Sequence, residues 1–269
     1  MKKEARINKI TRDIKTLKIQ GASSIAKAAL EAYSLSPNKK TKRKLINARA
    51  TEPLLSNTLN KFEKLGKKKT LIHFQQAQDK INLLVTKLIK NNSVIFTHCH
   101  STNVINALKY AKNKGKKFEV YNTETRPLFQ GRKTSRELKK AGINVTQFVD
   151  SAARIALTKN QNTKKVNFVF FGADAILKTG AINKVGSGMF AEIAYNHKIP
   201  VYIIADSWKF TSKVKFEERN FQEIWKKAPR NIKIKNLAFE AIPKKYIKAI
   251  ISEFGILSFD KFVKKVKKN

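Results

Sequence analysis

The chain has 269 residues, one cysteine, 42% apolar residues and a formal net charge of +38. This length can bury one large core or two modest ones, and a single cysteine excludes an internal disulfide and indicates a reducing, cytoplasmic compartment. The charged N-terminus is not followed by the apolar segment of a signal peptide, and no apolar run approaches the ~20 residues that span a bilayer. We therefore expect no membrane association.

Basic residues are spread along the entire chain and are mostly lysines. Such a charge can bind phosphate backbones by displacing counterions. No nucleic-acid recognition motif accompanies it, however, and runs such as Lys112 to Lys117 and Lys264 to Lys268 are typical of solvated faces. We therefore do not expect a nucleic-acid partner, and a biased genome explains the lysine excess as well as a binding surface does. The positive field can still concentrate phosphorylated substrates.

The first ninety residues place apolar side chains at helical spacing in the stretches 5–33, 45–59 and 71–90. Gly21, followed by small residues that include Ser23, interrupts the first stretch and is typical of a helix start. Backbone N–H groups at such a start can hold a phosphate, although most such caps bind nothing. Arg49 is expected at the head of a helical segment. We predict an N-terminal helical domain over residues 1–91.

From residue 92 onward, short apolar runs alternate with helical segments. This alternation predicts an α/β fold in which a Rossmann-like parallel sheet, covered by helices on both faces, forms a C-terminal domain over residues 92–269. The expected strands are 94–97, 118–122, 144–148, 166–171 and 201–205, and the expected helices are 103–113, 135–141, 151–157 and 189–197.

Polar residues follow each of the five expected strands. Ligands of such sheets bind beyond the carboxyl ends of the strands, so these residues are expected to share one rim. They are Cys99, Thr123 to Pro127, Asp150 with Ser151, Asp174, and Asp206 to Lys209.

Cys99 lies between His98 and His100 directly after the first expected strand. Neighbouring residues at a strand end point in opposite directions, and four histidines with one cysteine are few for zinc, so no metal is expected. A cysteine–histidine nucleophile pair has no evident third member. A small, buried, apolar cysteine is the simplest alternative.

Asp174 follows a run of apolar residues, and burial there would raise the pKa of its carboxyl group. A carboxyl group and a thiol with shifted pKa values suit a reaction that moves protons. The alternative for Asp174 is a helix N-cap. The glycine-containing segment 180–188, with Lys184, is expected to form a loop that holds a phosphate ahead of a helix. Lys209 and Arg126 are further cations near strand ends.

The chain resembles the regulatory alpha, beta and delta subunits of translation initiation factor 2B, together with the sugar-phosphate isomerases related to them. The resemblance covers nearly the whole chain in six ordered segments. They are Thr97 to Ser101, Tyr121 to Pro127 with Gln130-Gly131, Asp150 to Ala153, Gly172 to Ile176, Gly180 with Ile182 to Gly186, and Ala205 to Phe210.

Within this superfamily the catalytic members keep both the cysteine and the aspartate, whereas the eukaryotic regulatory subunits generally lack the pair. Cys99 and Asp174 therefore favour an enzyme. The sequence after Cys99 is more similar to the archaeal ribose-1,5-bisphosphate isomerases than to the methylthioribose-1-phosphate isomerases. Two residues depart from the usual pattern, because Gln20 stands where arginine is usual and His100 where asparagine is commoner.

The resemblance implies conversion of ribose 1,5-bisphosphate to ribulose 1,5-bisphosphate, an aldose–ketose isomerisation in archaeal nucleoside monophosphate (AMP) degradation, without a cofactor or metal. It implies that Asp174 opens the ring and that Cys99, as a thiolate, takes the carbon-bound proton, although a hydride shift stays open. A homodimer or hexamer is expected. The implied substrate-binding residues are Gln20, Gly21, Ala22, Ser23, Arg49, Ser101, Thr102, Asn103, Asn183, Lys184 and Lys209.

Two alternatives to this function stay open. One is a non-catalytic regulatory subunit that senses a nucleotide or sugar phosphate and binds initiation factor 2. The other is a methylthioribose-1-phosphate isomerase.

Overall fold

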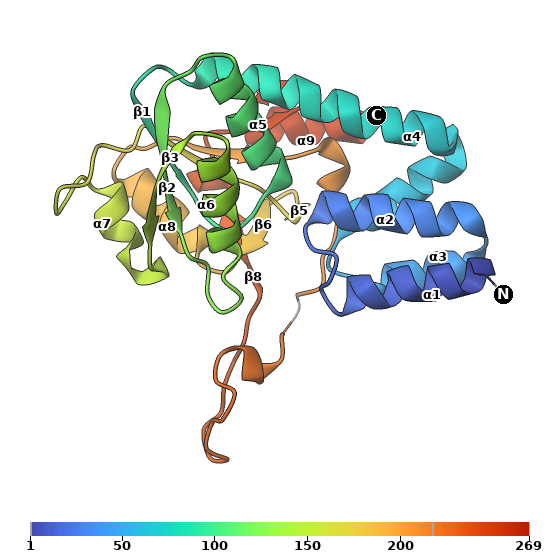
Figure 1. The fold of residues 1–269 in the computed structure, drawn as a ribbon. Helices are drawn as coiled ribbons and strands as arrows, with labels where there is room; N and C mark the ends of the chain where they lie inside the picture. Colours follow the sequence, from blue (N-terminus) through green and yellow to red (C-terminus); the bar gives the residue numbers. More distant parts are fainter. Residues whose placement is uncertain (1, 217, 269) are drawn as a thin grey trace.

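The computed structural model of the protein describes residues 2–216 and 218–268. Its N-terminal part is helical, as predicted, and stands beside an α/β body (Figure 1). Apolar side chains of all four N-terminal helices, among them Ile14, Ala29, Leu45 and Leu59, bury one another in a shared core. The helices are α1 (Lys2–Lys15), α2 (Ala22–Leu35), α3 (Lys39–Ala48) and α4 (Pro53–Leu88).

The predicted stretch 45–59 is broken in the structure. Helix α3 ends at Ala48, and α4 begins at Pro53, a residue suited to the first helical position because it lacks an N–H group. Arg49 therefore lies in the connection between two helices, which corrects its expected place at the head of one. Gly66, with a φ of +75°, kinks α4 into two halves.

The body is built on a seven-stranded sheet in the order β10-β9-β7-β4-β1-β2-β3, in which β10 alone runs antiparallel to its neighbour among the described strands. All five predicted strands are present. The strands are β1 (Ser93–Thr97), β2 (Phe118–Thr123), β3 (Asn144–Phe148), β4 (Phe168–Phe171), β7 (Val201–Ile204), β9 (Ala249–Ser252) and β10 (Gly255–Leu257).

Helices cover both faces of this sheet, so the predicted α/β class is confirmed. Successive residues of a strand face opposite sides, and β1 shows this directly, because Ile95 packs in one apolar core and Phe96 in the other. Helices α4 and α5 cover the Ile95 face, and α7, α8 and α9 cover the Phe96 face. The body helices are α5 (Thr102–Asn113), α6 (Gln130–Lys140), α7 (Ala153–Leu157), α8 (Ser187–Asn196) and α9 (Phe259–Lys268).

A second, three-stranded antiparallel sheet was not predicted. It consists of β5 (Ala175–Ile176), β6 (Gly180–Lys184) and β8 (Phe239–Pro243), in the order β5-β6-β8. The segment 180–188, expected to be a phosphate-holding loop, is therefore largely strand β6 followed by the start of α8. Asp174 precedes β5, so it is not a helix N-cap.

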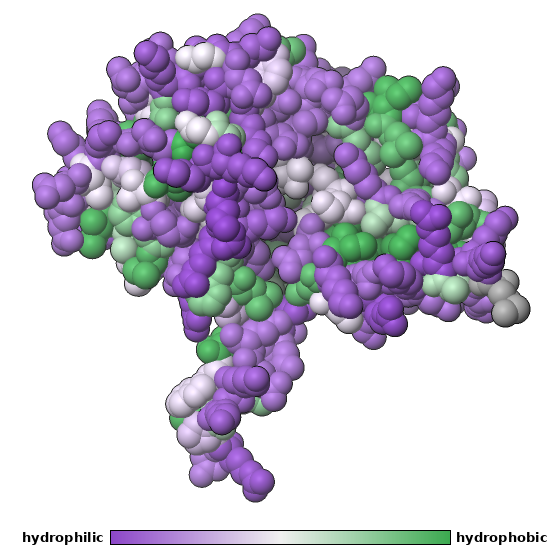
Figure 2. All heavy atoms as spheres, viewed as in Figure 1, coloured by the Kyte–Doolittle hydropathy of each residue, from purple (hydrophilic) through white to green (hydrophobic). Residues whose placement is uncertain are grey.

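An arm, described over residues 211–216 and 218–238, projects from the body between the short 3₁₀ turn η2 (Ser207–Lys209) and β8 (Figure 1). It carries exposed apolar side chains, including Phe216, Phe221 and Trp225. The face of the molecule in Figure 2 is otherwise mostly hydrophilic, in keeping with the charge of +38. Among the described residues, no helix has both the length and the apolar character needed to cross a membrane.

Candidate active site

One cavity lies where the N-terminal helices meet the carboxyl ends of β1 and β4, and it brings together every residue expected in the site. Cys99 and Asp174 both line it. The structure places the expected binding residues on its wall as well: Gln20, Gly21, Ala22, Ser23, Arg49, Ser101, Thr102, Asn103, Asn183, Lys184 and Lys209.

Cys99 follows β1 by two residues and holds a left-handed backbone, with a φ of +67°. For a residue with a side chain this conformation costs about 1–3 kcal/mol and persists where neighbours enforce it. Here the N–H of Cys99 donates to Thr125 Oγ1 (3.0 Å), and Thr134 Oγ1 donates to the carbonyl oxygen of Cys99 (2.7 Å). Two threonines from the neighbouring loop and helix therefore hold the backbone of Cys99 in this conformation.

The thiol of Cys99 is protonated in the free site at neutral pH. Burial raises its pKa from 9.0 to about 11, the positive charge of Lys184 opposes that rise, and the negative charge of Asp174 adds to it. Because Lys184 and Asp174 both act on the thiol, the three groups are electrostatically coupled. The thiolate expected to take the carbon-bound proton is therefore not the form that the free site favours.

Asp174 sits between β4 and β5, where two contacts fix its backbone. Its N–H donates to the carbonyl oxygen of Ile182 (2.8 Å), and the preceding carbonyl, that of Ala173, accepts a bond from Lys209 Nζ (2.6 Å). Burial raises the pKa of the Asp174 carboxyl group, as predicted, and the positive charges of Lys209, Lys184 and Arg49 oppose the rise. The carboxyl group thus faces three cations.

Two of these cations are lysines that the protein buries almost completely. Lys184 is 8% exposed and Lys209 is 4% exposed, which is rare for lysine. Lys184 Nζ lies 5.2 Å from the centroid of the Phe239 ring, and the Arg49 guanidinium lies 5.9 Å from the same centroid. Positive groups from three separate segments therefore converge on one cavity wall, an arrangement that suits an anionic ligand.

Two helices begin at the cavity and add backbone donors. Gly21 and Ser101 are the N-cap residues of α2 and α5, and neither cap is closed by a side-chain hydrogen bond. The first N–H groups of a helix lack partners within the helix and bind anions well. Gly172 leaves room for Ser101, because a Cβ atom at 172 would lie 2.4 Å from Ser101 Oγ.

Gln20 also reaches the cavity, but its side-chain amide is engaged locally. Nε2 donates to the carbonyl oxygen of Leu17 (2.9 Å). Asn183 is held similarly, because its Nδ2 donates to Ser187 Oγ (2.9 Å). Both amides are therefore oriented by neighbours on their own segments.

His98 and His100 flank Cys99 in sequence but bind different elements. His98 hydrogen-bonds to Thr123 Oγ1 (2.5 Å) and to the carbonyl oxygen of Val185 (3.0 Å), and burial lowers its pKa to about 4. His100 contacts Thr134 Oγ1 (3.1 Å), and burial, reinforced by Lys133, lowers its pKa to about 4 as well. Both imidazoles are neutral at pH 7.

Sequence reasoning missed the contribution of the arm. Arg219, Glu223 and Asn236 line the cavity; Arg219 pairs with Glu223 (2.5 Å), and Asn236 Nδ2 donates to Glu223 Oε2 (3.1 Å). Glu52 was missed too, and it approaches Arg49 to 4.0 Å. No periodicity or motif marks Arg219 and Glu223, because the folding of a long loop brings them to the site.

A Rossmann-like body with a thiol, a carboxyl group and buried cations at its strand ends defines a class of proteins that handle anionic metabolites. The model of the Initiation factor 2 subunit family matches residues 39–259. The chain belongs to this family.

Individual relatives agree with that assignment. The chain is 34% identical to the ribose 1,5-bisphosphate isomerase of Methanocaldococcus jannaschii, over 91% of this chain and 89% of the relative, and 32% identical to that of Archaeoglobus fulgidus, over 91% and 87%. The solved structure of the Pyrococcus horikoshii translation initiation factor eIF-2B superposes with a TM-score of 0.83 at 27% identity, covering 94% of this chain and 97% of that chain. The family resemblance seen in the sequence is thereby confirmed.

Proposed function

We propose that this protein is an aldose–ketose isomerase that converts ribose 1,5-bisphosphate into ribulose 1,5-bisphosphate. The observation that carries the proposal is the convergence of Cys99 and Asp174 with Arg49, Lys184 and Lys209 on one cavity. The names of its relatives in Methanocaldococcus and Archaeoglobus support the same reaction. In this proposal residues 1–91 and 92–269 form two domains that build the site together.

The cations favour a substrate with two phosphate groups. Lys184 and Lys209 are buried on the sheet side, and Arg49 comes from the helical side. Three cations on one cavity wall, together with the backbone donors at the starts of α2 and α5, offer more donors than a single phosphate group needs. Methylthioribose 1-phosphate has one phosphate and an apolar methylthio group, so it would leave part of this charge uncompensated.

Asp174 is suited to open the ring. The raised pKa of its carboxyl group favours the protonated form, which can donate a proton to the ring oxygen as the bond between that oxygen and C1 breaks. The carboxylate formed can then accept the proton of the C2 hydroxyl group as the C2 ketone forms. Asp174 ends protonated, as it began, and the C1 phosphate ester stays intact.

Cys99 is proposed to move the hydrogen from C2 to C1. As a thiolate it takes the C2 proton, which leaves an enol phosphate; the thiol so formed exchanges its hydrogen with solvent and then donates it to C1. With a pKa of about 11, forming the thiolate at pH 7 costs about 5 kcal/mol, because each pKa unit is worth 1.36 kcal/mol. A direct hydride shift from C2 to C1 avoids this cost and is the second candidate route.

Solvent exchange distinguishes the two routes, and the same assay tests the function. The purified protein is incubated with ribose 1,5-bisphosphate in D₂O, and the product is followed by NMR. Proton transfer predicts deuterium at C1 and loss of turnover in Cys99→Ser. A hydride shift predicts no deuterium at C1. Absence of ribulose 1,5-bisphosphate from the wild-type reaction would refute the isomerase function.

A non-catalytic regulator is the second candidate function. The local engagement of the Gln20 amide favours it, because that position supplies no cation for a phosphate. A regulator would bind initiation factor 2 with an affinity that Cys99→Ser and Asp174→Asn leave unchanged, and would not turn over the sugar. Pull-down and turnover assays on the same preparations separate the candidates.

We further propose that the protein works in the cytoplasm as a homodimer or hexamer. The exposed apolar side chains of the arm, Phe216, Phe221, Ile224 and Trp225, support self-association. Sedimentation equilibrium of the full chain measures the assembly directly, and a monomer at micromolar concentration would contradict this part of the proposal.

A further inference from the structure

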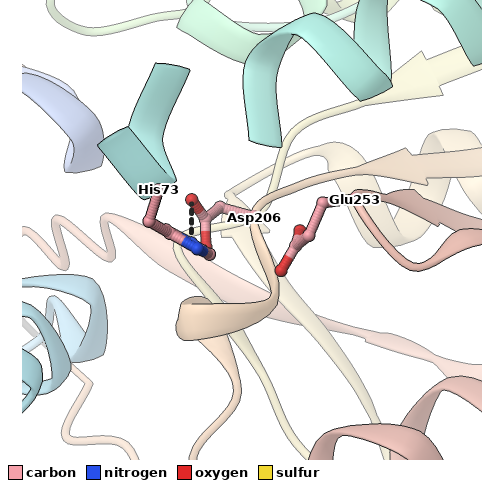
Figure 3. A group of neighbouring side chains, drawn as sticks. All are labelled: His73, Asp206 and Glu253. Carbon is pink, nitrogen blue, oxygen red and sulfur yellow. Dashed lines mark hydrogen bonds and ion pairs between the residues drawn. The ribbon is translucent and has the colours of Figure 1, made fainter. Parts of the chain in front are cut away.

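Three side chains with metal-binding chemistry meet outside the cavity, at the junction of α4, β7 and β9. His73 lies on α4, Asp206 follows β7, and Glu253 follows β9 (Figure 3). One ligand atom from each residue, an imidazole nitrogen or a carboxylate oxygen, lies within 4.8 Å of the other two. Segments far apart in the sequence therefore bring three donors to one point.

His73 and Asp206 are already held in position. His73 Nε2 lies 3.1 Å from both carboxylate oxygens of Asp206. The imidazole stacks on the Trp208 ring, with centroids 3.6 Å apart and an interplanar angle of 2°. The backbone N–H of Trp208 donates to Asp206 Oδ1 (2.8 Å). The Trp208 contacts can orient both ligands, as supporting contacts do in metal sites, and an ion bound between His73 Nε2 and Asp206 would replace their hydrogen bond.

Glu253 provides an independent indication of a missing ligand. Its Oε2 accepts the N–H of Ser207 (3.2 Å), but Oε1 is buried and has no hydrogen-bond partner among the described residues. A buried carboxylate oxygen without a partner is costly. The Asp206 side chain, only 4% exposed, adds a second poorly solvated carboxylate beside it. A cation would compensate both.

We propose that His73, Asp206 and Glu253 bind one divalent first-row transition-metal ion, for which Zn²⁺ is the best match. One imidazole and two carboxylates are typical Zn²⁺ ligands, whereas Ca²⁺ and Mg²⁺ prefer oxygen ligands throughout. Closing on an ion at about 2.0–2.2 Å draws Glu253 towards the other two ligands. The proposal does not depend on the isomerase function.

The bound ion would act as a clamp rather than take part in the reaction. It would tie α4 to the strand ends at the start of η2, the turn that carries Lys209 to the carbonyl oxygen of Ala173 beside Asp174. The ion would thus hold the helical part of the chain against the sheet and steady one cation of the cavity.

Metal titration of the full chain tests the site. The protein is treated with EDTA, dialysed and titrated with ZnCl₂ by calorimetry, and Co²⁺ is added separately because its visible absorption reports ligation by protein side chains. The variants are His73→Gln and Glu253→Gln. Matched controls are Asp79→Asn, on the same helix, and His197→Gln. Every titration is repeated with Cys99→Ser, so that the thiol cannot provide the site.

The wild type and both controls should bind one equivalent of Zn²⁺, and each ligand variant should bind at least about tenfold more weakly. Excess Zn²⁺ should raise the Tm of the wild type by several degrees and leave both ligand variants unchanged. An affinity for Zn²⁺ in His73→Gln and Glu253→Gln equal to that of the wild type would overturn the proposal. So would absence of Zn²⁺ and Co²⁺ binding by the wild type; an unchanged or higher Tm in Glu253→Gln would then be explained by a proton on Oε1.

Discussion

The sheet and the N-terminal helices contribute different kinds of group to the cavity. The strand ends supply the groups that exchange protons, Cys99 and Asp174, with the buried lysines beside them. The helices supply Arg49 and the start of α2, which can bind a phosphate but hold no proton for the reaction. Changes to Cys99 and Asp174 should therefore lower kcat, whereas changes to Arg49 and to the start of α2, which bind phosphate, should raise KM.

The largest effect is expected for Asp174→Asn. An amide has nearly the size of the carboxyl group but can neither donate nor accept the transferred proton, so kcat should fall by about 10³-fold or more with KM nearly unchanged. Steady-state kinetics measure both parameters, and Asp260→Asn, on the exposed surface of α9, is the matched control. A kcat within tenfold of the wild type would remove Asp174 from the reaction.

The buried, neutral state of His98, next to Cys99, can be tested by the dependence of stability on pH. The pKa of His98 is lowered from 6.5 to about 4, so the folded protein keeps the imidazole neutral while the unfolded chain protonates it below pH 6.5. The neutral imidazole therefore contributes about 3 kcal/mol to the free energy of unfolding above pH 6.5, and this contribution is lost as the pH falls towards 4. Urea unfolding of wild type and His98→Asn between pH 7 and 4 should give a shallower dependence in the variant; identical slopes would contradict this account.

A moderate effect is expected on the helical side. Arg49→Lys keeps the charge but loses the planar guanidinium that binds a phosphate through two hydrogen bonds, so KM should rise about tenfold with kcat within twofold. Arg12→Lys, on the exposed face of α1, controls for the change of residue type. If kcat falls instead, the division of labour between sheet and helices is wrong.

The smallest effect is expected for Gln20→Arg. The present amide donates to the carbonyl oxygen of Leu17, and a guanidinium at this position would add a cation to the helical side of the cavity. KM should fall about threefold at low salt. Gln161→Arg adds the same charge on an exposed turn and should change nothing. An unchanged KM would place residue 20 outside the reach of the substrate.

The inner parallel strands β1, β2, β4 and β7 could be predicted because their residues are mostly buried and read as short apolar runs, as in Val94 to Phe96. Strand β9, which pairs in parallel with β7, was not predicted. Strand β6 escaped prediction because glycine and polar residues interrupt it, and its pairing with β5 and β8 shows only in three dimensions. Helix α9 was taken for a solvated lysine run, although Phe259, Phe262 and Val263 bury one side of it.

The site was more predictable than its surroundings. The rule that ligands bind beyond strand ends placed Cys99, Asp174 and Lys209 together without any knowledge of distances. It could not place the arm residues Arg219 and Glu223 at the cavity, because a long loop has no periodicity that relates it to the cavity. Nor could it foresee the left-handed backbone of Cys99, which two threonines from other segments enforce.

The kinked helix α4 sets a limit on how this protein can be recombined. Leu55 and Leu59, before Gly66, belong to the helical core, whereas Ile81 and Val85, after it, belong to the core beneath the sheet. In a chimera joined at residue 91, the second half of α4, which packs on one face of the sheet, would come from the other relative. A junction at Gly66 leaves each of these two cores with its own half of the helix and divides the small cluster of Ala22, Ala26, Leu54 and Phe74. It is therefore a better place than residue 91 for two relatives to exchange their N-terminal helices.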